Sequence, residues 1–137
     1  MLVYKLVKVH TADLRKDDEY FSLSAYGNLR LQYRLNQLVE ATPPSLLFCF
    51  SNLTDARLDW YNYRWRASIL ECETDCEPES IDELPPLWHH GWDTIRFLQF
   101  WSLRNESIKM MRCQVTTYSA PIGTVGVQSL TPLRVVK

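Results

Sequence analysis

Two tryptophans four residues apart, Trp88 and Trp92, are the side chains in this sequence best suited to bind a ligand. They stand in the segment LPPLWHHGWDTIRFLQFWSL, where two prolines and Gly91 argue against a long helix. Residues 94–103 are aromatic and rich in strand-forming types, which predicts that a strand follows. A loop that places two indoles at the start of a strand can build a flat-walled pocket for a planar or methylated ligand. The alternative is that both indoles are ordinary core packing.

Charge is distributed unevenly along the chain. Of the 16 acidic residues, seven fall within 71–83, a stretch without Lys or Arg, which leaves nine acidic against 15 basic residues elsewhere. We interpret residues 71–86 as an acidic loop. A moderately basic body with one acidic loop is compatible with nucleic-acid binding, although many other surfaces have the same balance.

Length and composition predict one domain, residues 1–137, with a core of ordinary size. No apolar run approaches the roughly 18 residues that a membrane-spanning helix needs, so no membrane partner is expected. The first ten residues, MLVYKLVKVH, do not have the pattern of a signal peptide. We therefore expect a cytoplasmic protein whose four cysteines are reduced.

One helix is predicted, beginning at Leu29 and ending before the Thr42-Pro43-Pro44 segment. Its apolar residues have helical spacing, and Arg30 and Arg34 fall on another side that we interpret as a solvated polar face. The apolar residues of this stripe are Leu31, Leu35, Leu38 and Val39.

The other predicted elements are strands and loops. Alternation or short apolar runs predict strands over 1–9, 45–51, 63–73, 108–117 and 127–136, the last interrupted at Pro132. Residues 52–62 and 119–126 are predicted to be loops. Strands without helical crossovers indicate an α+β fold with a mostly antiparallel sheet, curled or closed into an open β-barrel, and one to three helices.

Metal and catalytic sites are weakly indicated. Cys72, Cys76, His89 and His90 could bind zinc, but the cysteine spacing is loose and no tight second pair follows. No nucleophile signature or phosphate-binding glycine loop is present. We therefore expect no cofactor and no enzymatic activity.

The order of several short motifs resembles the YTH domain and, more distantly, the EVE domain, both of the PUA-like superfamily. YKLVKVH (4–10) is similar to the opening strand, EYFSLSAYGN (19–28) to the segment with a Trp-Ser pair, and LLFCFSN (46–52) to the LIFSV-type strand. Trp88 and Trp92 before IRFLQFW (95–101) resemble the family's paired tryptophans, and PIGTVGVQ (121–128) resembles its late loop.

The resemblance implies a cage of Phe21, Trp88 and Trp92 that holds N6-methyladenine between aromatic faces. It also implies contacts to the base edge or to phosphate from a second set of side chains. Two departures stand out: Phe21 replaces a tryptophan, and the late loop has Thr124 and Val125 where the family has Arg-Asp. The implied contact residues are Lys8, His10, Ser22 and Asn52.

The sequence therefore predicts a non-catalytic reader of a methylated base in RNA or DNA. Four arginines, Arg30, Arg34, Arg64 and Arg66, would attract phosphates without base specificity. Related domains are often fused to or encoded with effector modules, which implies an effector protein as a further partner. The alternative is a protein-interaction module in which the tryptophans are core or hot spot and the acidic loop docks a basic partner. A hydrolase or nuclease is a third, weaker alternative.

Overall fold

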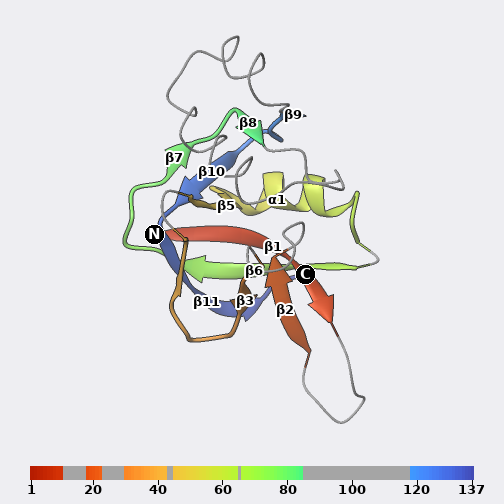
Figure 1. Cartoon of the computed structure of the whole chain (residues 1–137). Coiled ribbons are helices and arrows are strands. Elements are labelled where there is room, and N and C mark those ends of the chain that lie inside the picture. Colours follow the sequence, from red (N-terminus) through yellow and green to blue (C-terminus); the bar gives the residue numbers. More distant parts are fainter. Residues whose placement is uncertain (11–17, 23–29, 43–44, 65, 85–117) are drawn as a thin grey trace.

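The computed structural model describes residues 1–10, 18–22, 30–42, 45–64, 66–84 and 118–137 (Figure 1). Within them the chain forms one α-helix and eleven β-strands. In chain order they are β1 (Leu2–His10), β2 (Glu19–Ser22), β3 (Gln32–Tyr33), β4 (Val39–Glu40), β5 (Leu47–Phe50), α1 (Leu53–Trp60), β6 (Ala67–Glu73), β7 (Glu79–Ser80), β8 (Glu83–Leu84), β9 (Tyr118–Ser119), β10 (Thr124–Val127) and β11 (Ser129–Val135).

Nine of these strands form one sheet. Seven of them follow the order β4-β11-β6-β1-β5-β10-β7, and beside this path β2 pairs with β1 and β3 pairs with β2. Every described pair in it is antiparallel, and β8 and β9 form a separate antiparallel pair. An antiparallel sheet with a helix on it confirms the α+β class. The path has two ends, β4 and β7, so the described sheet is open and uncurled, whereas a curled sheet or barrel was expected.

β1 is the central strand and confirms the strand predicted over 1–9. One edge pairs with β6 from Leu2↔Glu73 to Lys8↔Ala67 without interruption. The other edge pairs first with β5, at Tyr4, and then with β2. Because side chains alternate along a strand, Val3 and Val7 face the larger core cluster and Leu6 faces the smaller one. Both faces of β1 are therefore covered over most of its length.

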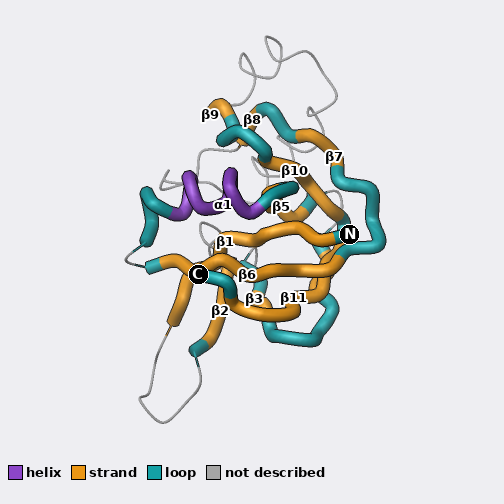
Figure 2. The backbone as a smooth tube through the Cα atoms, turned by 180° about the vertical axis from the view of Figure 1, so that it is seen from behind, coloured by secondary structure: helices purple, strands orange, loops and turns teal. Residues whose placement is uncertain are grey.

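The helix α1 covers one of these faces, where residues 52–62 were predicted to be a loop (Figure 2). Asn52 caps it: the side-chain oxygen accepts from the Asp55 amide at 2.9 Å, and the side-chain NH₂ donates to the Asp55 carboxylate at 2.7 Å. Ala56 is fully buried and packs with Leu6 and Ile69 in the smaller core cluster. The loop prediction was wrong because this short helix buries one small residue and has no strong apolar stripe.

The helix predicted to begin at Leu29 and to end before Thr42 is also wrong over its described part. Residues 32–33 and 39–40 are β3 and β4, and a turn between them contains Asn36 at φ 61°. Asparagine tolerates this left-handed conformation better than most residues, and its amide donates to the Pro132 carbonyl at 2.7 Å. Leu35 and Leu38, assigned to the apolar stripe, are exposed, while Tyr33 is buried.

The remaining predictions have mixed outcomes. The strand predicted over 45–51 is confirmed as β5, and the final strand is confirmed as β11, with its register to β6 shifting between Pro132 and Arg134. The strand predicted over 63–73 begins only at Ala67, and the loop predicted over 119–126 contains most of β10. The segment 71–86 is no single loop, because it includes the end of β6 and the short strands β7 and β8. The strands predicted over 94–103 and 108–117 lie outside the described residues.

No helix in the described part of the chain is both long enough and apolar enough to cross a membrane.

The described cysteines are all free and differ in exposure. Burial raises the pKa of Cys49 and of Cys72 to about 12. Cys76 is partly exposed, and a hydrogen bond with the Ser129 side chain lowers the pKa of its thiol. Since the thiolate is the reactive form, iodoacetamide should modify Cys76 well before the two buried cysteines in the folded protein.

Peptide mass spectrometry of a Cys113→Ser variant would measure this order, because that substitution removes the cysteine outside the described residues. Adding urea serves as the control, since unfolding should expose Cys49 and Cys72 together. Equal labelling of all three thiols without urea would contradict the buried positions of Cys49 and Cys72.

Candidate nucleic-acid interface

Strand register brings several predicted contact residues onto one face of β1, β2 and β3. Lys8 lies opposite Phe21, and Phe21 lies opposite Gln32. Directly opposed residues in antiparallel strands point to the same side, so these three side chains share a face. The neighbouring pair Tyr20↔Tyr33 points to the other side, where Tyr33 is buried in the larger core cluster.

Phe21 is contacted by two predicted residues on this face. The Arg30 guanidinium carbon lies 3.7 Å from the centroid of the Phe21 ring, within cation–π distance. The His10 ring lies 6.3 Å away, centroid to centroid, in an edge-on arrangement at 74°. Phe21 is half-buried, so the residue remains partly accessible to solvent.

Hydrogen bonds hold this arrangement in register. The Ser22 amide donates to the Leu31 carbonyl at 2.9 Å, and the Leu31 amide donates to the Ser22 hydroxyl at 3.0 Å. Arg34 donates to the Gln32 side-chain oxygen at 3.0 Å. We name this face the strand surface; it consists of Lys8, His10, Phe21, Arg30, Gln32 and Arg34. Glu19 lies opposite His10 and is the acidic residue in the register of β1 with β2.

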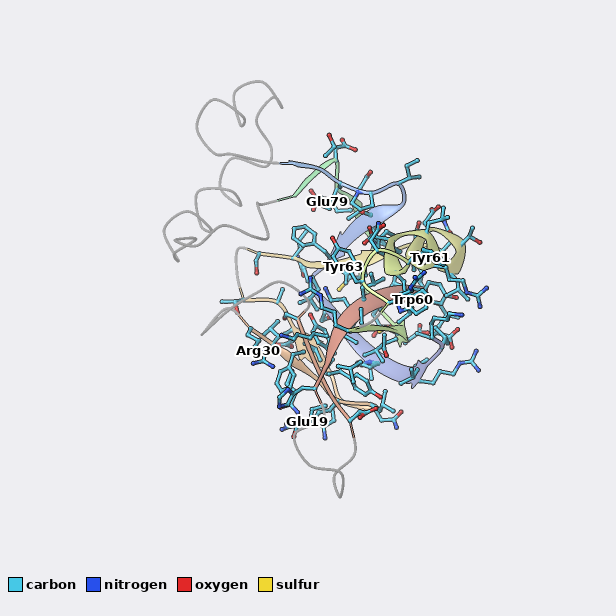
Figure 3. All side chains as sticks on the ribbon, turned by 90° about the vertical axis from the view of Figure 1, so that its right-hand side faces the viewer. Glu19, Arg30, Trp60, Tyr61, Tyr63 and Glu79 are labelled. Atoms are coloured by element: carbon cyan, nitrogen blue, oxygen red, sulfur yellow. The ribbon has the colours of Figure 1, made fainter. Side chains whose placement is uncertain are left out.

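A second group of aromatic and basic side chains lies at the carboxyl end of α1 (Figure 3). The Arg64 guanidinium lies 4.5 Å from the Tyr61 ring, and the Lys137 ammonium lies 5.0 Å from the Trp60 ring. A third cation–π contact, between Arg66 and Tyr63, spans 5.6 Å. We name this group the α1-end cluster; it consists of Trp60, Tyr61, Tyr63, Arg64, Arg66 and Lys137.

Backbone contacts fix the α1-end cluster against β6. The Trp60 indole N–H donates to the Ala67 carbonyl at 2.9 Å. The Ile69 amide donates to the Lys137 carbonyl at 3.2 Å, which brings Lys137 beside the helix end. Asp59 is the acidic residue of this turn; burial raises the pKa of its carboxyl group, and a hydrogen bond from Asn62 lowers it less.

The structure brings together five of the predicted contact residues and separates the others. Lys8, His10, Phe21, Arg30 and Arg34 belong to the strand surface, and Ser22 holds its backbone. Arg64 and Arg66 belong to the α1-end cluster. Asn52 is engaged as the cap of α1 rather than at either surface. The predicted cage residues Trp88 and Trp92 lie outside the described residues.

Sequence reasoning missed Tyr61, Trp60 and Lys137 as parts of a basic aromatic surface. The signal was present in residues 60–64, WYNYR, where three aromatic residues and one arginine fall within five positions. An asparagine cap followed by an acidic residue three positions later, Asn52 and Asp55, would have located the helix that ends there.

The described part of the chain contains no group of three or more His, Cys, Asp or Glu that could hold a metal ion. Of the two cysteines considered for zinc, the Cys72 thiol is buried and donates weakly to the Leu70 carbonyl, and Cys76 is hydrogen-bonded with Ser129. His89 and His90 lie outside the described residues.

Comparisons with protein-family models, with curated proteins and with solved structures gave no match.

Proposed function

We propose that this protein is a non-catalytic nucleic-acid reader that binds N6-methyladenine in single-stranded RNA, or in DNA with the base flipped out. The strand surface would hold the backbone, and Phe21 would form one wall of a cage completed by Trp88 and Trp92. The methylated base and the PUA-like, YTH-type architecture are proposed from the resemblance of the sequence motifs. Binding to nucleic acid is supported by the geometry of the strand surface.

The single observation that carries the proposal is the contact between Arg30 and Phe21, at 3.7 Å, on the same face as Lys8. A guanidinium plane and an aromatic ring both stack on nucleobases, and this pair presents the two together. Lys8, Arg30 and Arg34 are exposed and bring three positive charges to that face. Phosphate attraction beside a stacking ring is the combination that proteins use on single strands.

The Arg30 side chain gives Phe21 a specific role. Because the guanidinium stands over the ring, a base can reach that side of Phe21 only if Arg30 moves. The displaced guanidinium can then stack on the base from its other side or bind the adjacent phosphate, since Arg does both well. Either arrangement leaves the base in contact with the Phe21 ring.

Replacement of Phe21 by alanine tests the proposal. Removing one stacking ring costs about 1–3 kcal/mol per base, so the affinity for a methylated oligonucleotide should fall by about 5- to 150-fold. Phe21→Trp enlarges the wall and should bind at least as tightly as the original protein. Fluorescence anisotropy would compare N6-methyladenine and unmodified adenine in otherwise identical oligonucleotides.

Ile122→Ala is the matched control, because it removes a large apolar side chain that is 85% exposed in the turn before β10. It should leave affinity unchanged. Weak, equal binding of both oligonucleotides, unaffected by Phe21→Ala, would contradict the reader proposal and favour the protein-interaction module. A loss that is equal for methylated and unmodified oligonucleotides would retain nucleic-acid binding and remove the methyl specificity.

A further inference from the structure

We infer that the α1-end cluster is a second contact surface for the same nucleic-acid strand, binding nucleotides that flank the base held at the strand surface. This inference rests on the proposed function and extends it, because it predicts that affinity depends on oligonucleotide length. The cluster would supply a stacking ring, Tyr61, and phosphate contacts from Arg64 and Lys137.

Position is the first argument. Lys8 lies opposite Phe21 on one side of β1 and opposite Ala67 on the other. The Val9 amide donates to the Arg66 carbonyl at 3.0 Å, so the turn that carries the cluster lies directly beside the end of β1. With neighbouring strands about 4.8 Å apart, the backbones at Phe21 and Ala67 are about 10 Å from each other.

The two surfaces are adjacent, but they are too far apart to hold the same base. Figure 3 shows Arg30 and Tyr61 well apart in the molecule. A ligand that reaches both must therefore extend across Lys8. A flexible, negatively charged strand of several nucleotides fits this requirement, whereas a single free nucleotide would engage one surface only.

Charge and exposure are the second argument. Tyr61 is 66% exposed and lies under a guanidinium, as Phe21 does on the strand surface. Arg64 and Lys137 lie on aromatic rings, which have no net charge, so their positive charges are not neutralised by these contacts. Arg134, by contrast, is bound to Glu71 at 2.7 Å, and its charge is compensated within the protein.

A length series tests the inference. A trinucleotide and a nonanucleotide, each with one central N6-methyladenine, would be titrated against the original protein and a Tyr61→Ala, Arg64→Gln double variant. The variant should bind the trinucleotide as the original protein does. It should bind the nonanucleotide about tenfold more weakly, because it lacks one stacking ring and one cation. Its dependence on salt should also be shallower, by about 0.7 in the slope of log affinity against log salt.

Arg134→Gln is the matched control, since it removes an exposed guanidinium that is already paired with Glu71. It should change neither the affinity for the trinucleotide nor the affinity for the nonanucleotide. Thermal melting would verify that the double variant is folded, which is expected because Tyr61 and Arg64 are exposed.

The outcomes separate this inference from the proposed function. If Phe21→Ala weakens the binding of both oligonucleotides and the double variant weakens the binding of neither, the second surface is overturned and the reader proposal stands. If the double variant weakens binding of the nonanucleotide and Phe21→Ala has no effect, the reader proposal is overturned, and the α1-end cluster binds nucleic acid on its own rather than beside a base held at the strand surface. If neither oligonucleotide binds, both are overturned.

Discussion

Replacing Tyr33 with alanine is expected to lower the free energy of unfolding by about 3–5 kcal/mol, the usual cost of deleting a large buried aromatic side chain. Tyr33 is only 2% exposed and packs in the larger core cluster with Val3 and Val7. Its ring also lies 5.5 Å from the ammonium of Lys5, which is buried and donates to the Phe48 carbonyl. Urea denaturation followed by tryptophan fluorescence would measure the loss.

The same substitution should weaken oligonucleotide binding, because Tyr33 fixes β3 to the core and β3 holds β2 in register. Gln32→Ala is the matched control: its side chain points to the opposite face and contacts Arg34, so the cost in stability should be small. Tyr33→Phe keeps the ring and should retain most of the stability. A loss after Gln32→Ala as large as that after Tyr33→Ala would contradict the assignment of the two faces.

Gly123→Ala should destabilise the protein by about 2–5 kcal/mol. Gly123 has φ +84°, a left-handed conformation that costs other residues about 1–2 kcal/mol. A Cβ at this position would also overlap the Asp55 carboxylate and lie 2.9 Å from the Asp55 Cβ, and overpacking of this kind adds about 1–3 kcal/mol. Thermal and urea denaturation of the purified variant would measure the combined effect.

Gly126→Ala provides the comparison. Its Cβ would meet the Leu46 side chain at 2.8 Å and the Ile81 side chain at 3.3 Å, and its φ is not in the left-handed region. Because the nearest atom is the end of a flexible side chain, we expect a smaller loss than at Gly123. Adding Asp55→Ala to Gly123→Ala should relieve the overlap with the carboxylate, while the 2.9 Å contact with the Cβ of residue 55 and the backbone strain remain. If Gly126→Ala proved the more damaging of the two, the conformational argument at Gly123 would be wrong.

The sequence was informative where apolar residues form continuous or alternating runs. β1 and β5 were recognised from such runs, and Pro132 correctly indicated where β11 departs from regular pairing. Proline has no backbone N–H to donate to a neighbouring strand, so its effect on a sheet can be predicted from the sequence alone.

The region after Leu29 shows why spacing alone was insufficient. Its leucines fit a helical period, yet Gln32 and Tyr33 are paired with β2, and Val39 with β11. The strand β11 comes from a distant part of the chain, so the gain from burying Val39 beside it is not visible locally, whereas Tyr33 pairs with the nearby strand β2. Asn36 was a local sign of a turn, because asparagine adopts the positive φ that it has here more readily than most residues do.

The candidate site could be predicted residue by residue but not in its geometry. Phe21 and Lys8 were singled out through the resemblance of the sequence motifs to the YTH domain, and the register that places them opposite each other depends on pairing between β1 and β2. Arg30 was predicted on a helix face, and it reaches Phe21 because β3 folds back beside β2. The α1-end cluster went unrecognised as one surface because its members were divided between a predicted loop and a predicted strand.

The central place of β1 affects how the protein must fold as it leaves the ribosome. Its longest partner, β6, begins at Ala67, roughly 60 residues after β1 ends, which takes several seconds to synthesise at 5–20 residues per second. Until β6 has been synthesised, the side chains of Val3 and Val7 on β1 cannot pack against it. The residues that pair between β1 and β6 are far apart in the sequence. A chaperone that binds extended apolar segments would find its target in the nascent chain at β1.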